Sequence, residues 1–319
     1  MIRTESTVLT AAVEAAVRAP SPHNTQPWIF ELGPTGIDLF LDTDRLLKVC
    51  DADGREATLA CGAALLNIRL AIAAAGRSCE IDVLPDRTRP ALLAHVELGL
   101  RRRPHESELR LAAAIPRRFT NRRPFAEQAV PRNIRNLLTA AAHAEGGRLV
   151  LLDEIGKVSK VASLVRRADE MQAEDPAFQA EKRAWTSAEP HRLDGVPAAA
   201  GGPHPDGGLL PVRHHVASSA VRAYERDPVV AVLLSRTDGP RAQLRAGEAM
   251  QRVLLTATDA GLSSSFLSQP MEIPSLRAEL RTLLGGDEYP QTVLRFGYGY
   301  PGAPTPRRDL AMVTKTGER

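Results

Sequence analysis

A weak internal repeat constrains the fold of this chain more than any other feature of its sequence. When the sequence is shifted by 185 residues, two apolar segments that each end in glycine fall on one another. The matched pairs are Gly62 and Gly247, Gly76 and Gly261, Ser78 and Ser263, Pro85 and Pro270, Ala64 and Ala249, Leu70 and Leu255, and Ala75 and Ala260. Two apolar helices with C-terminal glycines can match by chance, but the added Ser and Pro matches favour a duplication. Two copies that pair with each other would form a pseudo-dimer inside one chain.

The predicted elements follow a similar order in the two parts of the chain. In the first part we expect a helix over 6–19 capped by Ser6 or Thr7, strands over 28–32 and 37–41, a long helix opened by the capping-box sequence Asp53-Gly54-Arg55-Glu56, and strands near 79–84 and 92–98. In the second part we expect helices over 131–143, 154–172 and 241–260, and strands over 148–152, 229–234 and 292–297. These patterns predict an α+β fold of two halves, residues 1–114 and 115–310, and a C-terminal tail over 311–319.

Length and composition exclude several classes of protein. The 319 residues allow two domains or one large α/β domain, and a net charge of +3 with 4% aromatic residues argues against a nucleic-acid partner. Three cysteines without a CxxC pair indicate a reduced, cytoplasmic protein. His204, His214 and His215 lack metal-ligand spacing, so we expect no metal site. No stretch approaches ~18 uninterrupted apolar residues and no apolar signal region opens the chain, so we expect no membrane span and no standard export signal.

The segment Ala19-Pro20-Ser21-Pro22-His23-Asn24-Thr25-Gln26-Pro27-Trp28 carries the strongest functional signal. Three prolines stiffen it, and it offers hydrogen-bonding side chains beside one large flat hydrophobic side chain. A planar ring with a polar edge, such as a flavin, needs this combination. On composition alone, a proline-rich turn with Trp28 packed in the core is the simpler interpretation.

Alternating basic and hydroxyl side chains mark a second segment. If Arg118, Thr120 and Arg122 lie on an extended strand, all three side chains point to one face. Two guanidinium groups and a hydroxyl would then suit a phosphate, and Arg307 or Arg308 could add a further cation. A solvated basic loop is the alternative.

A long insertion interrupts the second half. Residues 175–228 are rich in glycine and proline and too long for an ordinary connection, which predicts either a functional lid or a disordered segment. Phe178 and Trp185 are its candidate apolar anchors.

These motifs together resemble the FMN-dependent nitroreductase family, and most closely its Acg branch, in which two nitroreductase-like halves are fused. The segment 19–28 is similar to the family signature APS-x-x-N-x-QPW, which borders the flavin. Residues 118–122 resemble the phosphate-binding R-x-[ST]-x-R element. Residues 297–301, followed by Pro306-Arg307-Arg308, resemble the closing strand and C-terminal basic element. The resemblance implies the nitroreductase-like fold, with antiparallel sheets flanked by helices and FMN at the junction of the halves.

The resemblance also implies the residues of the site. They are Ser21, His23, Asn24, Gln26, Pro27, Trp28, Arg118, Thr120, Arg122, Leu267, Ser268, Gln269, Arg307 and Arg308. In the family, backbone N–H groups of the stretch matching 266–269 face the flavin N5, and the usual acidic residue and glycine are replaced here by Ser268 and Gln269. The first half has no R-x-[ST]-x-R of its own before residue 20, so one FMN per chain is expected. Flavin N5 is the reactive centre, and no catalytic side chain is named.

Three functions follow from the resemblance. The first is an FMN-dependent NAD(P)H oxidoreductase that reduces nitroaromatics or quinones by ping-pong hydride transfer, either as a monomer with an internal pseudo-dimer or as a homodimer. The second is a flavin-binding or flavin-storage protein in which residues 175–228 cover the site and prevent turnover. The third is a structural relative without FMN. Reduction of the purified holoprotein by NAD(P)H separates the first two.

Overall fold

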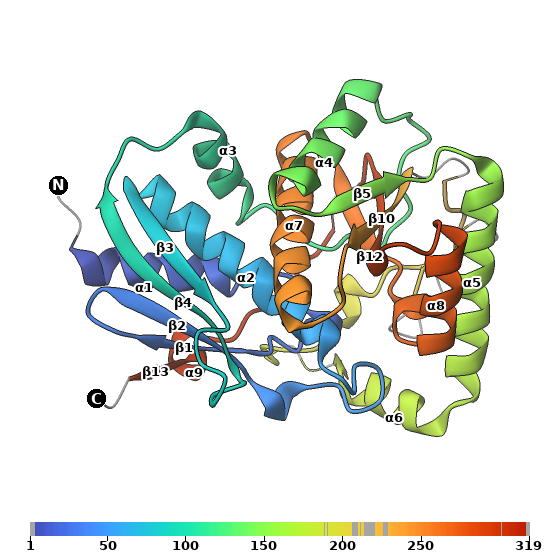
Figure 1. The fold of residues 1–319 in the computed structure, drawn as a ribbon. Helices are drawn as coiled ribbons and strands as arrows, with labels where there is room; N and C mark the ends of the chain where they lie inside the picture. Colours follow the sequence, from blue (N-terminus) through green and yellow to red (C-terminus); the bar gives the residue numbers. More distant parts are fainter. Residues whose placement is uncertain are drawn as a thin grey trace.

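The computed structural model describes residues 4–187, 189, 191–205, 210, 212–213, 221–225, 229–300 and 302–316. These residues form two large sheets, of five and four strands, with long helices between them (Figure 1), and two short two-stranded sheets. His214, His215 and Pro301, which the sequence singled out, lie outside the described residues.

The first half is one sheet with helices on one face. Its elements are α1 (Glu5–Ala16), η1 (Pro22–Asn24), β1 (Trp28–Leu32), β2 (Gly36–Leu41), η2 (Thr43–Arg45), α2 (Arg55–Ala74), β3 (Arg77–Val83), β4 (Leu92–Arg101) and α3 (Glu106–Ala114). The strands pair antiparallel in the order β1-β2-β4-β3. Alternate residues such as Phe30, Ile37 and Leu39 are buried in the main core with residues of α1 and α2.

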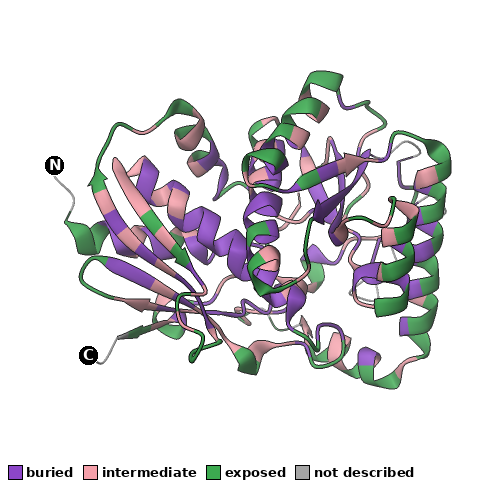
Figure 2. Cartoon of the chain, viewed as in Figure 1, coloured by how far each residue is buried: buried purple, intermediate pink, exposed green. Residues whose placement is uncertain are grey.

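The second half is a sheet covered on both faces. Its elements are α4 (Arg132–Ala144), β5 (Arg148–Leu151), α5 (Ile155–Glu174), β10 (Val229–Ser235), α7 (Pro240–Asp259), β11 (Ser263–Phe266), η4 (Gln269–Met271), α8 (Pro274–Leu283) and β12 (Tyr289–Gly297). The central strand β10 is buried along its whole length (Figure 2). Ala231 and Leu233 join the core with α4 and α7, whereas Val230 and Val232 join a second core with α5 and α8. An uninterrupted apolar strand is the expected result of burial on both faces.

The two sheets have the same topology. The order β1-β2-β4-β3 in the first half corresponds to β5-β10-β12-β11 in the second, and every one of these pairs is antiparallel. The long helices α2 and α7 end in the same way, at Gly76 with φ +79° and Gly261 with φ +78°. This correspondence confirms the predicted α+β fold of two similar halves. The C-terminal segment adds α9 (Leu310–Val313) and β13 (Thr314–Thr316), and β13 pairs parallel to β1 as a fifth strand of the first sheet.

The two halves meet where α2 crosses α7, in the middle of the molecule (Figure 1). Gly62 and Gly247, which the repeat pairs, face each other at this crossing. A Cβ on Gly62 would collide with the carbonyl oxygen of Leu244, and a Cβ on Gly247 would collide with the carbonyl oxygen of Leu59. Each would also lie 2.9 Å from the Cα of the opposite glycine. The two contacts are related by the same shift of 185 residues, so the crossing has the symmetry that the repeat predicts.

By length and composition alone, the helix α2 could cross a membrane, because its mean hydropathy is 1.7 in an 18-residue window. However, 83% of that window is buried inside the protein, where α1, α3 and α7 pack against it. The apolar character of α2 is therefore that of a core helix.

Two predicted helix caps are wrong, and the sequence patterns do not predict the helices α3, α6 (Pro176–Ala184), α8 and α9. Thr4 caps α1 by accepting a hydrogen bond from the Thr7 N–H, in place of Ser6 or Thr7. The helix α2 has no capping box at 53–56; the Asp51 carboxylate instead accepts from the N–H groups of Glu56 and Ala57, each at 2.8 Å. The short helices α3 and α8 follow irregular segments, where no clear apolar period marked them.

The insertion over 175–228 contains ordered elements. They are α6 (Pro176–Ala184), β6 (Thr186–Ser187), β7 (Val196–Pro197), η3 (Ala198–Ala200), β8 (His204–Pro205) and β9 (Val221–Arg222). The anchor Phe178 is buried with Leu47 and Cys50, and Trp185 packs beside them. Residues far apart in the sequence thus hold the described part of the insertion against the first half.

We expect Gly62→Ala to destabilise the fold, because neither backbone at the α2–α7 crossing has room for a methyl group. Overpacking of a core costs about 1–3 kcal/mol, and a clash with backbone belongs at the upper end. Gly156→Ala in α5 is the control, since a Cβ there meets no atom within 4 Å. That change should be neutral or stabilise by about 0.5–1 kcal/mol. Urea unfolding measures both variants, and wild-type stability of Gly62→Ala would show that the helices do not cross here.

Candidate functional site

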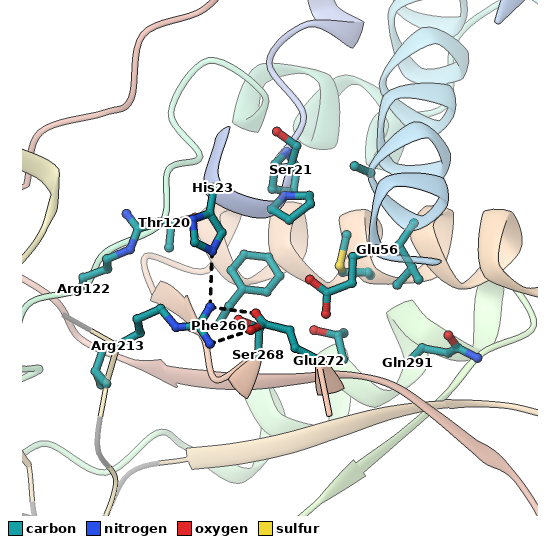
Figure 3. Close-up of a pocket in the computed structure, with 17 residues that line it drawn as sticks. Ser21, His23, Glu56, Thr120, Arg122, Arg213, Phe266, Ser268, Glu272 and Gln291 are labelled. Carbon is teal, nitrogen blue, oxygen red and sulfur yellow. Dashed lines mark hydrogen bonds and ion pairs between the residues drawn. The ribbon is translucent and has the colours of Figure 1, made fainter. Parts of the chain in front are cut away.

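A cavity lies at the junction of the two halves and the insertion (Figure 3). The residues that line it combine apolar side chains with a few polar and charged groups, as is usual for small-molecule sites. The lining residues are Pro20, Ser21, Pro22, His23, Glu56, Leu59, Ala60, Thr120, Arg122, Val212, Arg213, Met250, Phe266, Ser268, Glu272, Gln291 and Thr292. Five of the predicted site residues are among them: Ser21, His23, Thr120, Arg122 and Ser268.

The turn that follows α1 has an unusual backbone. His23, Asn24 and Gln26 have positive φ angles of 46°, 58° and 54°. Side chains with a Cβ adopt this region at a cost, and asparagine tolerates it best. A hydrogen bond of 2.9 Å from the Gln26 N–H to the Ser21 Oγ closes the turn. Such strained backbone gathers at functional sites, where the surrounding structure holds it in place.

Asn24 and Gln26 hold this turn by binding backbone of two distant segments. The Asn24 Nδ2 donates to the carbonyls of Gly195 at 3.0 Å and Pro306 at 3.1 Å. The Gln26 Nε2 donates to the carbonyl of Leu193 at 2.8 Å, and its Oε1 accepts from the Arg308 N–H at 2.8 Å. Neither residue lines the cavity. Their amides join the turn to the insertion and to the C-terminal segment.

Pro27 and Trp28 lie on the core side of the same segment. The Trp28 side chain is fully buried in the main core. The Pro27 carbonyl accepts hydrogen bonds from the Asp42 N–H and the Cys61 Sγ. The indole packs the site turn against α2, as the alternative interpretation of this motif expected.

Residues 118–122 run beside β11. Thr120 forms an isolated bridge with Ser264, and the Asn121 N–H donates to the Ser264 carbonyl at 2.9 Å. Thr120 and Arg122 line the cavity, whereas Arg118 does not. The Arg122 Nη1 donates to the carbonyl of Ala200, so the insertion also touches this side chain.

Arg118, which is buried, and Arg307, which is partly buried, form a cationic pair. Each donates an Nη2 hydrogen bond to the carbonyl of Arg18, at 3.1 Å and 3.4 Å. The Nε and Nη1 of Arg118 and the Nε of Arg307 are buried without a partner. No carboxylate within 4 Å of either guanidinium occurs among the described residues. Burial lowers the pKa of Arg118 to about 10. Burial, with the positive charges of Arg118 and Arg18, lowers that of Arg307 to about 9. Buried cations with unused N–H groups favour an anion.

Arg308 has a different environment from Arg307. Its Nη2 donates to the Met312 carbonyl at 2.7 Å, and its Nη1 lies 3.8 Å from the Asp42 carboxylate. Arg308 therefore fixes the C-terminal helix to the first sheet, and Arg307 is the basic residue that joins Arg118.

The last residue of β11, Phe266, and Ser268 in the segment after it line the cavity. Leu267 is buried in the second core, and its N–H donates to the Val293 carbonyl at 3.0 Å. Gln269 is also fully buried and points toward Asp169 of α5. The described contacts therefore leave Ser268 as the cavity-facing member of the predicted pair.

Arg213 is a charged residue of the cavity wall that the sequence patterns do not indicate. Its guanidinium enters the cavity wall and binds both oxygens of Glu272 at 2.7 Å (Figure 3). It also donates to Gln172 at 2.8 Å and contacts the His23 Nε2 at 3.4 Å. The ring of Phe178 lies 5.4 Å from its Cζ. No local pattern marks Arg213, because its partners lie in four separate parts of the chain.

Burial shifts the pKa values of the titratable side chains that line the cavity. Desolvation, with help from the charge of Arg213, lowers the pKa of His23 to about 3, so this imidazole is neutral near pH 7. Burial opposes ionisation of Glu272, but Arg213 and a hydrogen bond from Ser268 outweigh it and keep the pKa of Glu272 below its usual value. Burial, with the nearby carboxylates of Glu272 and Asp51, raises the pKa of Glu56 to about 8 despite the attraction of Arg55. The cavity thus holds one ionised and one protonated carboxyl group near neutral pH.

No family model matches the chain. Its sequence is 36% identical over 323 residues to the Mycobacterium tuberculosis protein named "Putative NAD(P)H nitroreductase Rv3131", covering 98% of this chain and 91% of that protein. A second M. tuberculosis protein named as a nitroreductase, acg, is 33% identical over 318 residues, covering 96% of this chain and 95% of its own length.

Among solved structures, a nitroreductase with bound FMN from Desulfitobacterium hafniense aligns with a TM-score of 0.44 and 13% identity, over 65% of this chain and 98% of that one. A nitroreductase with bound FMN from Bacteroides fragilis aligns with a TM-score of 0.40 and 16% identity, over 62% of this chain and 93% of that one. The full-length sequence relatives establish the assignment: the chain belongs to the nitroreductase family, in the branch that contains acg.

Proposed function

We propose that this protein binds one FMN at the junction of its halves and works as an NAD(P)H-dependent oxidoreductase. The observation that carries the proposal is the cationic pair of the buried Arg118 and the partly buried Arg307. The Nε and Nη1 of Arg118 and the Nε of Arg307 have no partner and suit a phosphate dianion. The names of the M. tuberculosis relatives support NAD(P)H as the electron donor. The solved nitroreductases from D. hafniense and B. fragilis contain bound FMN.

The residues that line the cavity suit the rest of the cofactor. Leu59, Ala60, Met250 and Phe266 give it apolar walls for a flat ring, and Ser21, Thr120 and Ser268 add hydroxyl groups. Thr120 and Arg122 lie two and four residues after Arg118, so the phosphate seat and the ring pocket would share one segment. Asn24, Gln26, Pro27, Trp28, Leu267, Gln269 and Arg308 would act indirectly, by holding that pocket in shape.

FMN, when bound, supplies hydride transfer through its N5. The residues of this chain position the nicotinamide of NAD(P)H and a small nitroaromatic or quinone acceptor in turn, and exclude water from the cavity. Ping-pong order follows, because both reactants would use one cavity. All three cysteines are free, which suits a reducing cytoplasmic setting.

A second candidate function is flavin binding with little turnover. Val212 and Arg213 of the insertion line the cavity, and the Arg213–Glu272 pair fastens this segment there. If the segment covers the ring, nicotinamide cannot stack on it. Removal of the whole insertion would not test this idea cleanly, because it would also remove Glu225. The Glu225 carboxylate pairs with the buried Arg295 at 2.7 Å and accepts a hydrogen bond from the Phe125 N–H.

We expect Arg118→Ala and Arg307→Ala to weaken FMN binding by ~10- to 100-fold each, since a charge-assisted hydrogen bond contributes about 1.5–3 kcal/mol. Riboflavin, which lacks the phosphate, should lose much less affinity. Arg117→Ala is the control, because Arg117 is exposed next to Arg118. Calorimetric titration of apoprotein measures all three. Equal losses of affinity for FMN and riboflavin would show that the phosphate binds elsewhere. If wild-type protein binds no FMN, the protein is a structural relative that works without this cofactor.

The double variant Arg213→Gln/Glu272→Gln tests the occluding segment. It removes the ion pair without leaving one buried charge alone, which would be costly. If the segment limits access, NAD(P)H should reduce the bound FMN several-fold faster in the variant, as followed by stopped-flow absorbance. Dithionite, a small diffusible reductant, should act equally on both proteins. Arg192→Gln, which breaks a pair with Asp194 away from the cavity lining, is the control. Rapid turnover of wild-type protein would favour the plain reductase.

A further inference from the structure

Glu56 is the second residue of α2 and lines the cavity between the two halves. Its Oε1 accepts a hydrogen bond of 2.8 Å from the Nη2 of Arg55, which leaves Oε2 as the oxygen able to carry a proton. In Figure 3 its carboxyl group extends into the cavity, from the side opposite Arg122 and toward Glu272. The side chain keeps 15% of its surface exposed, so a small molecule in the cavity can reach it.

The charged groups around Glu56 come from four parts of the chain. Arg55 lies on the same helix and Asp51 in the turn that caps it. Glu272 follows η4, and Arg213 comes from the insertion. Arg213 has both its Nη atoms on Glu272, so its charge is largely engaged there. Arg55 also binds the backbone carbonyls of Gln291 and Met271. Burial with two carboxylates nearby therefore outweighs the two cations, which accounts for the raised pKa of about 8.

The other lining residues cannot take this role. Both oxygens of Glu272 are bound by Arg213, and its carboxylate is ionised. His23 has a pKa of about 3, so it carries no imidazolium proton near pH 7. Arg122 and Arg213 hold their protons too tightly to donate them. Among the described residues that line the cavity, Glu56 is the group whose acidity suits proton donation near neutral pH.

We propose that Glu56 is a catalytic residue of this site, which donates the proton that an electron acceptor needs when it takes a hydride. This inference rests on the proposed flavin-dependent function and adds a side chain to it. A quinone that gains one hydride from the cofactor and one proton from Glu56 becomes a hydroquinone. A nitro group that gains the same hydride and proton loses one N–O bond and becomes a nitroso group and water. Glu56 is left as a carboxylate and recovers a proton from solvent before the next cycle.

The first test follows the oxidation of dithionite-reduced holoprotein by 1,4-benzoquinone between pH 6 and 9. The wild-type rate should be constant at low pH and fall toward ~10-fold per unit above about pH 8, because only protonated Glu56 donates. Glu56→Gln keeps an oxygen for Arg55 but has no acidic proton. It should be slower by ~10²- to 10⁴-fold at low pH and show no such pH dependence. Glu56→Asp should restore a pH-dependent rate.

Glu106→Gln is the matched control, since Glu106 also lies in the first turn of a helix and pairs with an arginine, but is exposed on α3. It should behave as wild type. A Glu56→Gln protein with the wild-type rate and pH profile overturns the proposal. A slower rate that keeps the wild-type pH profile also overturns it, because the side chain would then only position the reactants.

The second test needs no cofactor. Infrared difference spectra of apoprotein between pH 6 and 10 should show a carboxylic-acid carbonyl band that disappears near pH 8. The band should be absent in Glu56→Gln and present in Glu106→Gln. If the band is missing from wild-type protein, Glu56 has no proton to donate, and the proposed proton transfer fails. The proposed reduction of bound FMN by NAD(P)H is unaffected by that result. If the protein binds no FMN, the proposed function and the proton transfer both fail.

Discussion

The direct backbone contact between Gly62 and Gly247 determines how the two halves sit against each other. With no side chain between them, α2 and α7 approach until each glycine faces the other helix's backbone. This close crossing brings the N-terminal end of α2 toward the middle of α7 and the end of β11. Glu56, Leu59, Met250 and Phe266 consequently line one cavity, although they come from different halves. The site is a product of the pairing, and neither half contains it alone.

The duplication is symmetric at the crossing but not at the site. The shift of 185 residues carries Glu56 to Arg241 and Ser268 to Val83. At the equivalent place, Arg241 reaches across and donates to the Val83 carbonyl at 2.6 Å. Nearby, Arg69 bridges the carboxylates of Glu145 and Glu248. Hydrogen bonds and ion pairs thus fill the second position, and one cofactor per chain agrees with this asymmetry.

The sequence predicts the framework better than it predicts the site. Alternating and helical apolar periods locate most strands and long helices, because burial against a single core imposes those periods. The repeat even identifies the two glycines of the crossing. Side-chain direction is harder: Asn24 and Gln26 have the chemistry of ligand contacts, yet they bind the backbone of residues 193–195 and 306–308. Arg213 and Glu56 acquire their environments from distant segments, so no local pattern could indicate them.

The strained turn links these distant segments to the cavity. Positive φ angles at non-glycine residues cost of order 1–3 kcal/mol each, with less for asparagine. Hydrogen bonds to the carbonyls of Leu193, Gly195 and Pro306 offset that cost only while the insertion and the C-terminal segment stay docked. Arg307 belongs to the same network, because its Nη1 donates to the Asn24 Oδ1 at 3.0 Å. An anion held by Arg307 and Arg118 would therefore stabilise the turn, the insertion and the C-terminal segment together. Cofactor binding and docking of the insertion would then be thermodynamically coupled.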